Sequence, residues 1–274
     1  MEEKLYKFHE EIKLECPSMI IGWNEDAGGI GTGVVSYLVK KLKGRLLAEI
    51  EPTGFFPLNG VTIRDDVARF PESKLYYCPE NELLLFESDS PHADWYRFLN
   101  TVIDMAQFHC RLNEIYTIGG MIALNAHTAP RRVTAVASLP EEKAEIRGFE
   151  IDSAMNYETP EGQRPTLSSY LIWVAGQRKI KGASIWAPIP FYLTSVDDPQ
   201  SWRMLLIFFD KKFGLNLNFA DLDRSIAAQN EKLSQARLNT PELDEYIKRL
   251  ETNQPLSQEE NDKLVMEIEE ILKK

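Results

Sequence analysis

The stretch MIIGWNEDAGGIGTG at residues 19–33 decides the fold that the sequence predicts. Residues 19–23 are an apolar run with the length of a buried strand, and residues 24–26 are a polar turn. Glycines at positions 28, 29, 31 and 33 then open a helical pattern, whose apolar residues recur from Val34 to Leu42. A strand, a tight glycine turn and a helix are how an α/β domain begins. We therefore predict an α/β fold, in which a ligand would bind near the carboxyl end of this strand.

The remaining chain alternates in the same way up to about residue 222. Short apolar runs predict strands, and apolar residues at helical spacing predict helices between them. We expect strands at residues 46–50, 61–64, 74–78, 83–86, 115–118, 133–136 and 183–187, and helices at residues 95–106, 167–174 and 202–213. Residues 139–165 show little periodicity, and we expect loops with a short helix there.

Charge and composition exclude several classes of protein. The 274 residues carry a formal net charge of -11, which argues against binding along a nucleic-acid backbone. The first residues are too charged for a signal peptide, and no apolar run reaches the length of a membrane span. The three cysteines are far apart and in no metal spacing, as expected for free thiols in a reducing compartment. We therefore expect a cytoplasmic protein that contacts neither nucleic acid nor membrane.

The composition changes near Asp221, which divides the chain into an α/β domain at residues 1–222 and a helical appendage at residues 223–274. The appendage has 20 charged side chains in 52 residues and no strand-like run. Thr240 and Pro241 predict one helix start, and Ser257 with Glu260 forms the capping box of another. Apolar residues at helical spacing in three successive segments predict helices that pack on the domain or on a neighbouring subunit. A solvated, partly disordered tail is the alternative.

The glycine turn resembles a nucleotide-binding loop only in part. A phosphate loop of the ATPase kind needs Gly-Lys-Ser/Thr at the helix start, and no lysine stands there. A dinucleotide fingerprint would need a third glycine at Val34, although Glu49 lies where that motif has its ribose-binding acid. Two interpretations remain: glycines that allow close packing, or backbone amides that hold an anion or polar ligand. The candidate ligand residues of the turn are Asp26, Gly28, Gly29 and Gly31.

Four side chains could supply charge or acid–base chemistry. Asp26 stands at a strand end as a general base or, alternatively, as the cap of the following helix. His127 has Arg131 and Arg132 nearby, which could form a cationic pocket for phosphate or carboxylate. A loop histidine that only bonds to backbone is the alternative. No complete catalytic set, metal spacing or cofactor motif appears, so we expect no metal and no cofactor.

Three blocks of sequence resemble the proteasome assembly chaperone family in its archaeal and bacterial single-chain form. The first, GWNEDAG at residues 22–28, is similar to the family's Gly-aromatic-x-Asp-Ala-Gly opening with one extra residue. The second, IGG at residues 118–120 followed by AHTAPR at residues 126–131, resembles Leu-Gly-Ala and then Pro-His-Thr-Arg-Pro. The third, ASIWAPIPFY at residues 183–192, resembles Ser-Leu-Trp-Ala-x-Val-Pro-His-Tyr. The order and spacing of these blocks over residues 17–222 carry the resemblance.

The resemblance implies a three-layer α/β/α sandwich similar to nucleoside phosphorylases, and a tendency to form homo-oligomers. Ala126 and Ala129 replace residues that the family usually has beside the His-Thr pair, and Phe191 stands where a histidine is common. Some members dock onto proteasome rings through a C-terminal hydrophobic-Tyr-x tail. Here Lys273 stands in place of the tyrosine, so we do not expect docking by that route.

Two functions follow as hypotheses. The first is a non-enzymatic protein-binding or assembly-chaperone-like protein that self-associates. Its candidate interface aromatics, for which core burial is the alternative, are Phe55, Phe56, Phe191 and Tyr192. The second is a phosphorylase-like enzyme or a binder of phosphate or nucleosides, which would use the glycine turn together with His127 and Arg131.

Overall fold

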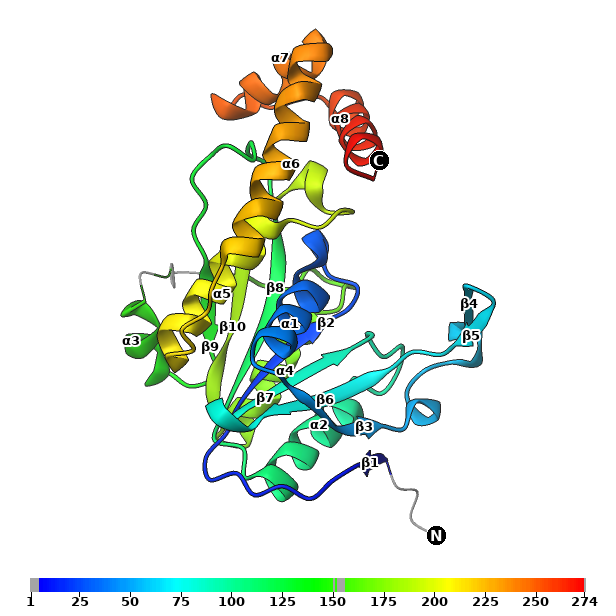
Figure 1. Ribbon diagram of the computed structural model, residues 1–274, viewed down its shortest axis with the longest axis vertical. Helices are drawn as coiled ribbons and strands as arrows, with labels where there is room; N and C mark the ends of the chain where they lie inside the picture. The colour runs from blue at the N-terminus through cyan, green and yellow to red at the C-terminus, as the bar shows by residue number, and fades with distance from the viewer. Residues whose placement is uncertain (1–4, 150, 152–155, 274) are drawn as a thin grey trace.

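The computed structural model describes residues 5–149, 151 and 156–273, and its middle layer is an eight-stranded mixed sheet (Figure 1). In spatial order the strands are β1 (Tyr6–Phe8), β3 (Arg45–Ile50), β6 (Ser73–Cys78), β7 (Leu83–Ser88), β2 (Ser18–Trp23), β8 (Glu114–Ala123), β10 (Lys181–Pro190) and β9 (Thr134–Ala137). The four strands from β7 to β10 run parallel, and the strands on either side of them are antiparallel to their neighbours.

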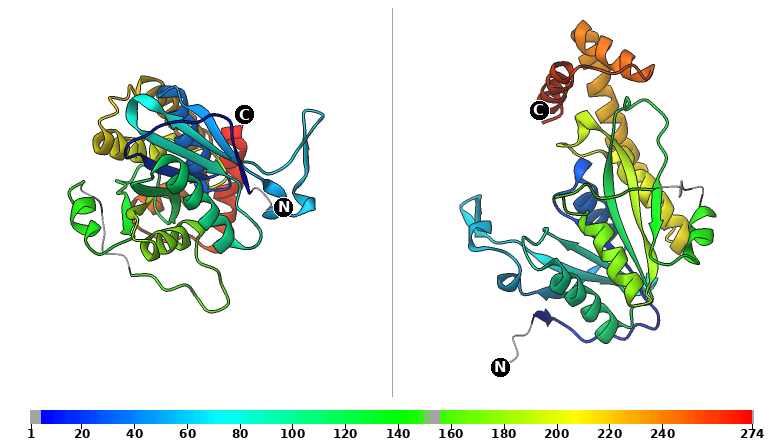
Figure 2. Two further views of the ribbon diagram at one scale, coloured as in Figure 1. Left: turned by 90° about the horizontal axis from the view of Figure 1, so that it is seen from below. Right: turned by 180° about the vertical axis from the view of Figure 1, so that it is seen from behind.

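Helices cover both faces of this sheet. On one face, α1 (Ile30–Lys41) and α5 (Pro199–Phe213) share a hydrophobic cluster with the sheet. On the other face, α2 (Trp95–Cys110) and α4 (Leu167–Gln177) share a second cluster. The short helix α3 (Glu142–Arg147) lies beside β9. The arrangement confirms the predicted three-layer α/β/α sandwich, and Figure 2 shows it from two further sides.

The apolar run in β2 places this strand in the centre of the sheet. All six of its residues are buried. Ile20 packs into the α1 and α5 cluster, whereas Met19 and Ile21 pack into the cluster on the opposite face. This alternation is the two-residue period of a strand. A strand that is apolar on both faces buries both of them only when helices cover each side of the sheet.

Two short strands, β1 and β5 (Val67–Arg69), lie outside the predicted set. β1 has three residues and forms the sheet edge, where it pairs with β3. The predicted strand at residues 61–64 is β4 (Thr62–Arg64), which pairs with β5 (Val67–Arg69) in a separate two-stranded sheet instead of joining the large one. This hairpin projects from the side of the body (Figures 1 and 2).

The C-terminal segment forms three helices, α6 (Ala220–Asn239), α7 (Pro241–Glu251) and α8 (Gln258–Lys273). Their buried side chains belong to the same hydrophobic cluster as α1 and α5, and α8 contacts the short turn Phe191–Leu193. The predicted capping box is confirmed, since Ser257 N donates to Glu260 Oε2 at 2.6 Å and Glu260 N donates to Ser257 Oγ at 3.3 Å. None of the helices among the described residues is both long and apolar enough to span a membrane.

The packing of α8 predicts how the tail responds to truncated side chains. Ile268 is fully buried, whereas Met266 on the same helix is 64% exposed. We expect Ile268→Ala to lower the free energy of unfolding by about 2–5 kcal/mol, because it leaves a cavity against the body. Met266→Ala, the matched control, should change it by less than about 0.5 kcal/mol. Thermal or urea unfolding measures both, and equal effects would mean that α8 does not pack as described.

The close approach of β2 to α1 predicts a second effect on stability. A Cβ atom on Gly31 would lie 1.9 Å from the carbonyl oxygen of Trp23, so the backbone would have to move. We expect Gly31→Ala to destabilise the fold by at least about 3 kcal/mol. Gly54→Ala is the control, because a Cβ there would meet no atom within 4 Å. If both variants unfold at the temperature of the wild type, the strand and helix are farther apart than the structure shows.

Candidate functional site

The glycine turn begins with Asp26, whose side chain holds β2, β8 and the turn together. One carboxylate oxygen accepts a hydrogen bond from Ala27 N at 2.9 Å, and the other accepts one from Gly120 N at 2.8 Å. Burial raises the pKa of Asp26 to about 6, although these two bonds act in the opposite direction. Both oxygens accept hydrogen bonds from backbone N–H groups, as expected if Asp26 caps the turn instead of acting as a general base.

The backbone amides of the turn are also occupied. Gly28 N donates to Thr194 O at 3.0 Å, and Gly29 N donates to Asp26 O at 3.2 Å. The next amide, that of Ile30, bonds to the carbonyl of Ala27. Four successive amides, at positions 27–30, therefore bond within the chain. A phosphate loop needs such amides free and pointing at the ligand.

The turn is covered by the segment that leads into α5. Asp198 N donates to the carbonyl of Gly28 at 2.9 Å, and the indole of Trp202 donates to the same oxygen at 2.8 Å. Gly28 and Gly29 have φ values of 66° and 62°, a left-handed conformation that glycine adopts without strain. A Cβ on Gly29 would lie 2.4 Å from Asp197 Oδ1. The glycines therefore permit close packing, the interpretation that needs no ligand.

His127 lies on the loop after β8 and bonds to Tyr192. The backbone N–H of His127 donates to the Tyr192 hydroxyl at 2.6 Å, and Nδ1 lies 2.8 Å from the same oxygen. The hydroxyl hydrogen is then left to donate to Nδ1. Burial, followed by the charges of Arg131 and Arg237, lowers the pKa of His127 to about 4. This histidine is therefore neutral at physiological pH and offers no positive charge to an anion.

Arg131 does not offer a free charge either, because it forms a buried ion pair with Asp198. The side chain of Arg131 is 5% exposed and that of Asp198 is fully buried. Arg131 also donates to Ser201 Oγ at 2.8 Å and to His127 O at 3.3 Å. Asp198 N in turn donates to the carbonyl of Gly28, so the ion pair joins the first and second motif blocks.

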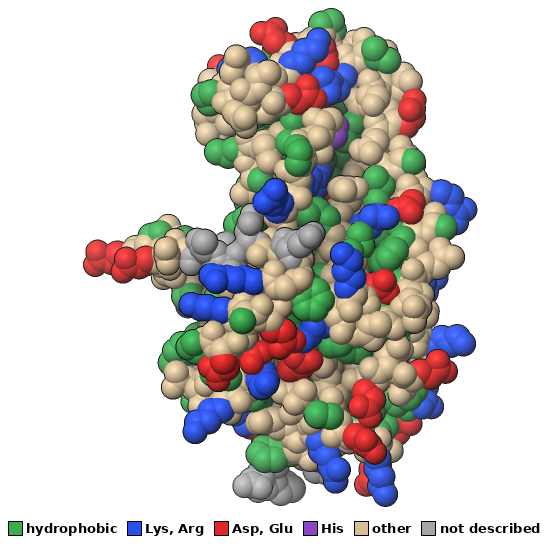
Figure 3. Space-filling model, turned by 90° about the vertical axis from the view of Figure 1, so that its left-hand side faces the viewer, with side chains coloured by type: hydrophobic (Ala, Val, Ile, Leu, Met, Phe, Trp, Pro, Cys, Tyr) green, Lys and Arg blue, Asp and Glu red, His purple; other side chains and the backbone are tan. Residues whose placement is uncertain are grey.

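A cleft of about 610 Å³ lies between the His127 loop, α5 and α6. His127 and Arg131 line it, together with polar side chains that include Gln200, Asn230 and Ser234. None of the turn residues Asp26, Gly28, Gly29 and Gly31 lines this cleft. Figure 3 shows one side of the molecule, with a single histidine side chain (purple) visible in the upper lobe. The structure thus brings the two candidate loop residues together but separates them from the turn.

Three of the four aromatic residues predicted for an interface are buried inside the chain. Phe55 and Phe56 are 3% and 5% exposed and pack edge-on against Phe98. Tyr192 is fully buried, and Phe191 is partly buried against it. Because Phe55, Phe56 and Tyr192 are buried, they cannot contact another molecule in this structure. Their geometry is that of core packing, the alternative interpretation.

Sequence reasoning missed Asp198, Ser201 and Trp202, which connect the candidate residues. The Asp-Pro pair at the start of α5 is a signal of a helix cap, and Asp198 Oδ1 does accept from Ser201 N at 3.4 Å. Nothing in that pattern indicates the second role of Asp198 as the partner of Arg131. Glu49, the acid of the partial dinucleotide fingerprint, lies on β3 and bonds to His9 at 2.8 Å. Two strands, β6 and β7, separate β3 from β2.

The buried neutral His127 predicts a pH dependence of stability. Its pKa is lowered from 6.5 to about 4. Between these two pH values, His127 therefore binds a proton in the unfolded chain but stays neutral in the folded chain. Stability should therefore fall between pH 6.5 and pH 4, by about 1 kcal/mol per pH unit at most. His127→Asn keeps an acceptor near Tyr192 but does not titrate, and its unfolding temperature should fall less on acidification.

Comparing the wild type with the His127→Asn variant separates the pH dependence that His127 causes from the opposite pH dependence that Asp26 causes. The pKa of Asp26 is raised from 3.8 to about 6, so this residue gains stability as the pH falls through that window. Asp26 is present in both proteins, and its contribution cancels in the difference. Parallel curves of unfolding temperature against pH for wild type and variant would contradict the buried, neutral state of His127.

Comparisons with known proteins place this geometry in a family. The sequence pattern of the PAC2 family matches residues 19–237. The comparison with curated proteins gives no match. Among the described residues, no three His, Cys, Asp or Glu side chains are arranged to hold a metal ion.

Solved structures with the same fold include three from bacteria and archaea. A proteasome-assembly chaperone homologue of Mycobacterium tuberculosis is 20% identical, with a TM-score of 0.69 over 85% of this chain and 100% of that one. PbaB of Pyrococcus furiosus, an archaeal proteasome activator, is 21% identical, with a TM-score of 0.69 over 86% and 100%. A Corynebacterium glutamicum protein of unknown function is 17% identical, with a TM-score of 0.75 over 91% and 96%.

At these identities the structural likeness shows a shared fold, and the family follows from the sequence pattern. That pattern begins inside β2 and ends in α6, so it includes all three motif blocks. It covers most of the chain, and the chain therefore belongs to the PAC2 family, as its resemblance to proteasome assembly chaperones predicts.

Proposed function

We propose that this chain is a non-enzymatic, protein-binding member of the PAC2 family that acts in a chaperone-like way as a homo-oligomer. The family membership supports this proposal. Two of the solved relatives are described as a proteasome-assembly chaperone homologue and as an archaeal proteasome activator, and both descriptions refer to the proteasome, a protein assembly. A cytoplasmic location would fit this role and the three free cysteines.

The observation that carries the proposal is how the motif residues use their polar groups. Asp26 is bonded to two backbone amides, and Arg131 is paired with the fully buried Asp198. His127 bonds to Tyr192 through both its backbone and its ring. A catalytic site needs polar groups that can reach a substrate. Here they stabilise the loops at the carboxyl edge of the sheet, which supports a scaffold for binding proteins.

The C-terminal helix α8 packs its apolar side chains inside the chain. Leu264 and Ile268 are fully buried, and Ile271 and Leu272 pack against the same cluster. The apolar side of α8 therefore contributes to the packing of the tail and is used inside the chain.

The phosphorylase-like alternative depends on the glycine turn, whose amides at positions 27–30 are bonded within the chain. A thermal-shift screen with phosphate, nucleosides and nucleotides tests it directly. Ligand at 100 times its Kd would add about 2.7 kcal/mol of stability. We expect no shift, and a shift that Asp26→Asn abolishes would favour the alternative.

Self-association and protein binding are tested on the purified chain. We expect light scattering at micromolar concentration to give a mass of at least twice the 31.4 kDa of one chain. We also expect size-exclusion chromatography to show a complex with unassembled proteasome subunits of the same organism. An unrelated acidic protein of similar size, mixed with the same subunits, is the control. A mass of one chain would contradict self-association, and the absence of a complex would contradict the assembly role.

A further inference from the structure

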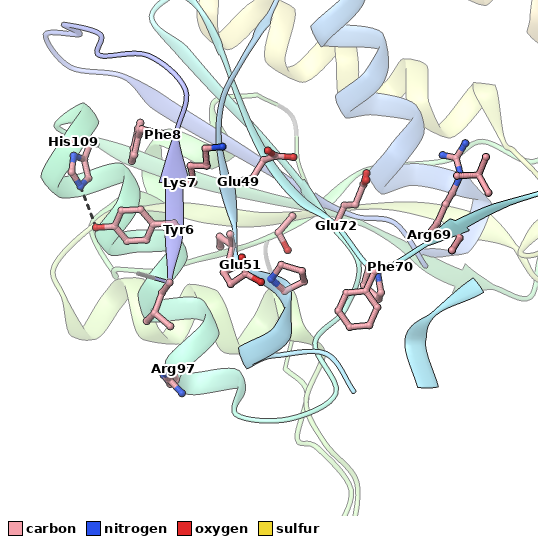
Figure 4. A pocket seen from close by; sticks show the side chains of 17 residues that line it. Tyr6, Lys7, Phe8, Glu49, Glu51, Arg69, Phe70, Glu72, Arg97 and His109 are labelled. Atoms are coloured by element: carbon pink, nitrogen blue, oxygen red, sulfur yellow. Dashed lines mark hydrogen bonds between the residues drawn. The ribbon is translucent and has the colours of Figure 1, made fainter. Parts of the chain in front are cut away.

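Two hollows of the molecule differ in how closely their lining defines a ligand. A groove of about 1590 Å³ beside β1 has charges of both signs along it (Figure 4). Its charged lining residues are Lys7, Arg69, Arg97, Glu49, Glu51 and Glu72, which do not select one kind of ligand. The cleft of about 610 Å³ that is lined by residues 127–131 and by side chains of α5 and α6, here called the His127 cleft, is more selective.

The ring of His127 leaves one hydrogen-bond donor in this cleft. Nδ1 of the neutral ring accepts from the Tyr192 hydroxyl, so the ring hydrogen is on Nε2. Nε2 forms no hydrogen bond within the described part of the chain, and it is not among the polar side-chain atoms that are buried there without a partner. Since His127 lines the cleft, its Nε2–H is accessible to a molecule that enters.

Arg131 adds a second donor whose hydrogen is unused. Its side chain is 5% exposed, and its Nε is buried without a hydrogen-bond partner among the described residues. The other two guanidinium nitrogens bond to Asp198, Ser201 and the carbonyl of His127. A buried N–H group without an acceptor is costly, and Arg131 also lines the cleft. The lining therefore calls for a ligand with an oxygen acceptor.

The charges around His127 cancel one another. Those that act on its ring are Arg131 and Arg237, which are positive, and Asp198 and Glu251, which are negative. Arg131 pairs with Asp198, and Arg237 pairs with Glu251. An ionic ligand would gain little attraction from such paired charges to offset the loss of its hydration. The cleft therefore favours an uncharged ligand.

α5 and α6 supply groups that both donate and accept. Gln200 of α5 lines the cleft together with Asn230 and Ser234 of α6, which are four residues apart and project from the same side of the helix. None of these three side chains bonds to another described residue. Each of the two amides has an N–H₂ donor and a carbonyl acceptor, which can pair with another amide.

The rest of the lining favours a small amide over a nucleobase. It is small or aliphatic, as at Leu193, Met204 and Leu233. Among the described residues that line the cleft, His127 provides the single ring. Proteins commonly hold a base by stacking it on aromatic side chains, whereas a carboxamide is recognised by donors and acceptors at its ends.

We propose that the His127 cleft binds an uncharged carboxamide, whose oxygen accepts from His127 Nε2–H with Arg131 Nε–H as a second donor. The N–H groups of the ligand donate to the side-chain oxygens of Gln200 or Asn230. The volume of the cleft, about 610 Å³, is that of a small-molecule site. Such a carboxamide occurs in free glutamine-like molecules and in Asn or Gln side chains of a protein segment. The inference goes beyond the proposed function, because it does not require self-association.

The first experiment titrates the wild-type chain at pH 7 with N-acetyl-L-glutamine amide and follows the histidine rings by long-range ¹H–¹⁵N NMR. The signals of His127 are those absent from the spectrum of His127→Asn, and we expect them to shift until the site is saturated. N-acetyl-L-glutamate amide has the same shape but a carboxylate in place of the side-chain amide, and should bind at least about tenfold more weakly. The absence of a His127 shift up to the solubility limit of the probe, or equal binding of both probes, would overturn the carboxamide site.

The second experiment removes one amide from α6. Asn230→Ala should raise the Kd of N-acetyl-L-glutamine amide at least about threefold, because the variant lacks one partner of the ligand. Asn239→Ala removes the same group from the same helix outside the cleft and should leave the Kd unchanged. Both residues are exposed, so the two variants should unfold at the temperature of the wild type. Equal Kd values for the three proteins would overturn the placement of the ligand against α6.

A third titration distinguishes the two sources of the carboxamide. The probe is a capped, uncharged peptide that has one glutamine among serines and glycines. Binding at least about tenfold tighter than that of the single residue would assign the site to a protein segment, and equal binding would assign it to a small molecule. A chain that forms homo-oligomers without a His127 shift contradicts only this site. A monomer that gives the shift contradicts only self-association.

Discussion

The buried ion pair between Arg131 and Asp198 is the interaction on which the carboxyl edge of the sheet depends. Asp198 is fully buried, so its charge must be balanced inside the protein. Arg131 provides the opposite charge, and Ser201 Oγ donates to the same carboxylate at 2.9 Å. Losing one partner of such a pair leaves an uncompensated charge that typically costs about 3–5 kcal/mol. The pair therefore fixes the His127 loop to α5 and, through Asp198 N and Gly28, to the glycine turn.

This constraint explains why a sequence typical of a ligand site forms a structural junction. The carboxyl end of a parallel sheet usually leaves loop amides and polar side chains for a ligand. In this chain the turn after β2 takes its partners from β8 and from the segment before α5. Asp26 bonds to Gly120, and Gly28 bonds to Thr194. The groups that would recognise a small molecule bond instead to other parts of the same chain.

The sequence predicted the parts of the fold that arise from local pattern. The run in β2, the helix after the glycine turn and the capping box at Ser257 each depend on residues close together in the chain, where periodicity and capping act. β1 and β5 have three residues each, too few for a period to appear. The pairing of Arg131 with Asp198 joins positions 67 residues apart. Periodicity and capping patterns span only a few residues, so they could not predict it. For Phe55 and Phe56, local pattern could not decide between core and interface.

The charged C-terminal tail packs against the α/β domain. Several of its charges pair within the tail, since Arg237 pairs with Asp244 and Glu251. Glu251 also accepts a hydrogen bond from Thr128, so the tail is tied to the His127 loop. The helices cover the edge of the sheet that α/β proteins commonly use for ligands. β1, an outer strand of the eight-stranded sheet, and the projecting β4–β5 hairpin lie away from the tail (Figure 1). The tail and the motif loops thus close the carboxyl end of the sheet with contacts inside the chain, far along the sheet from its outer strand β1.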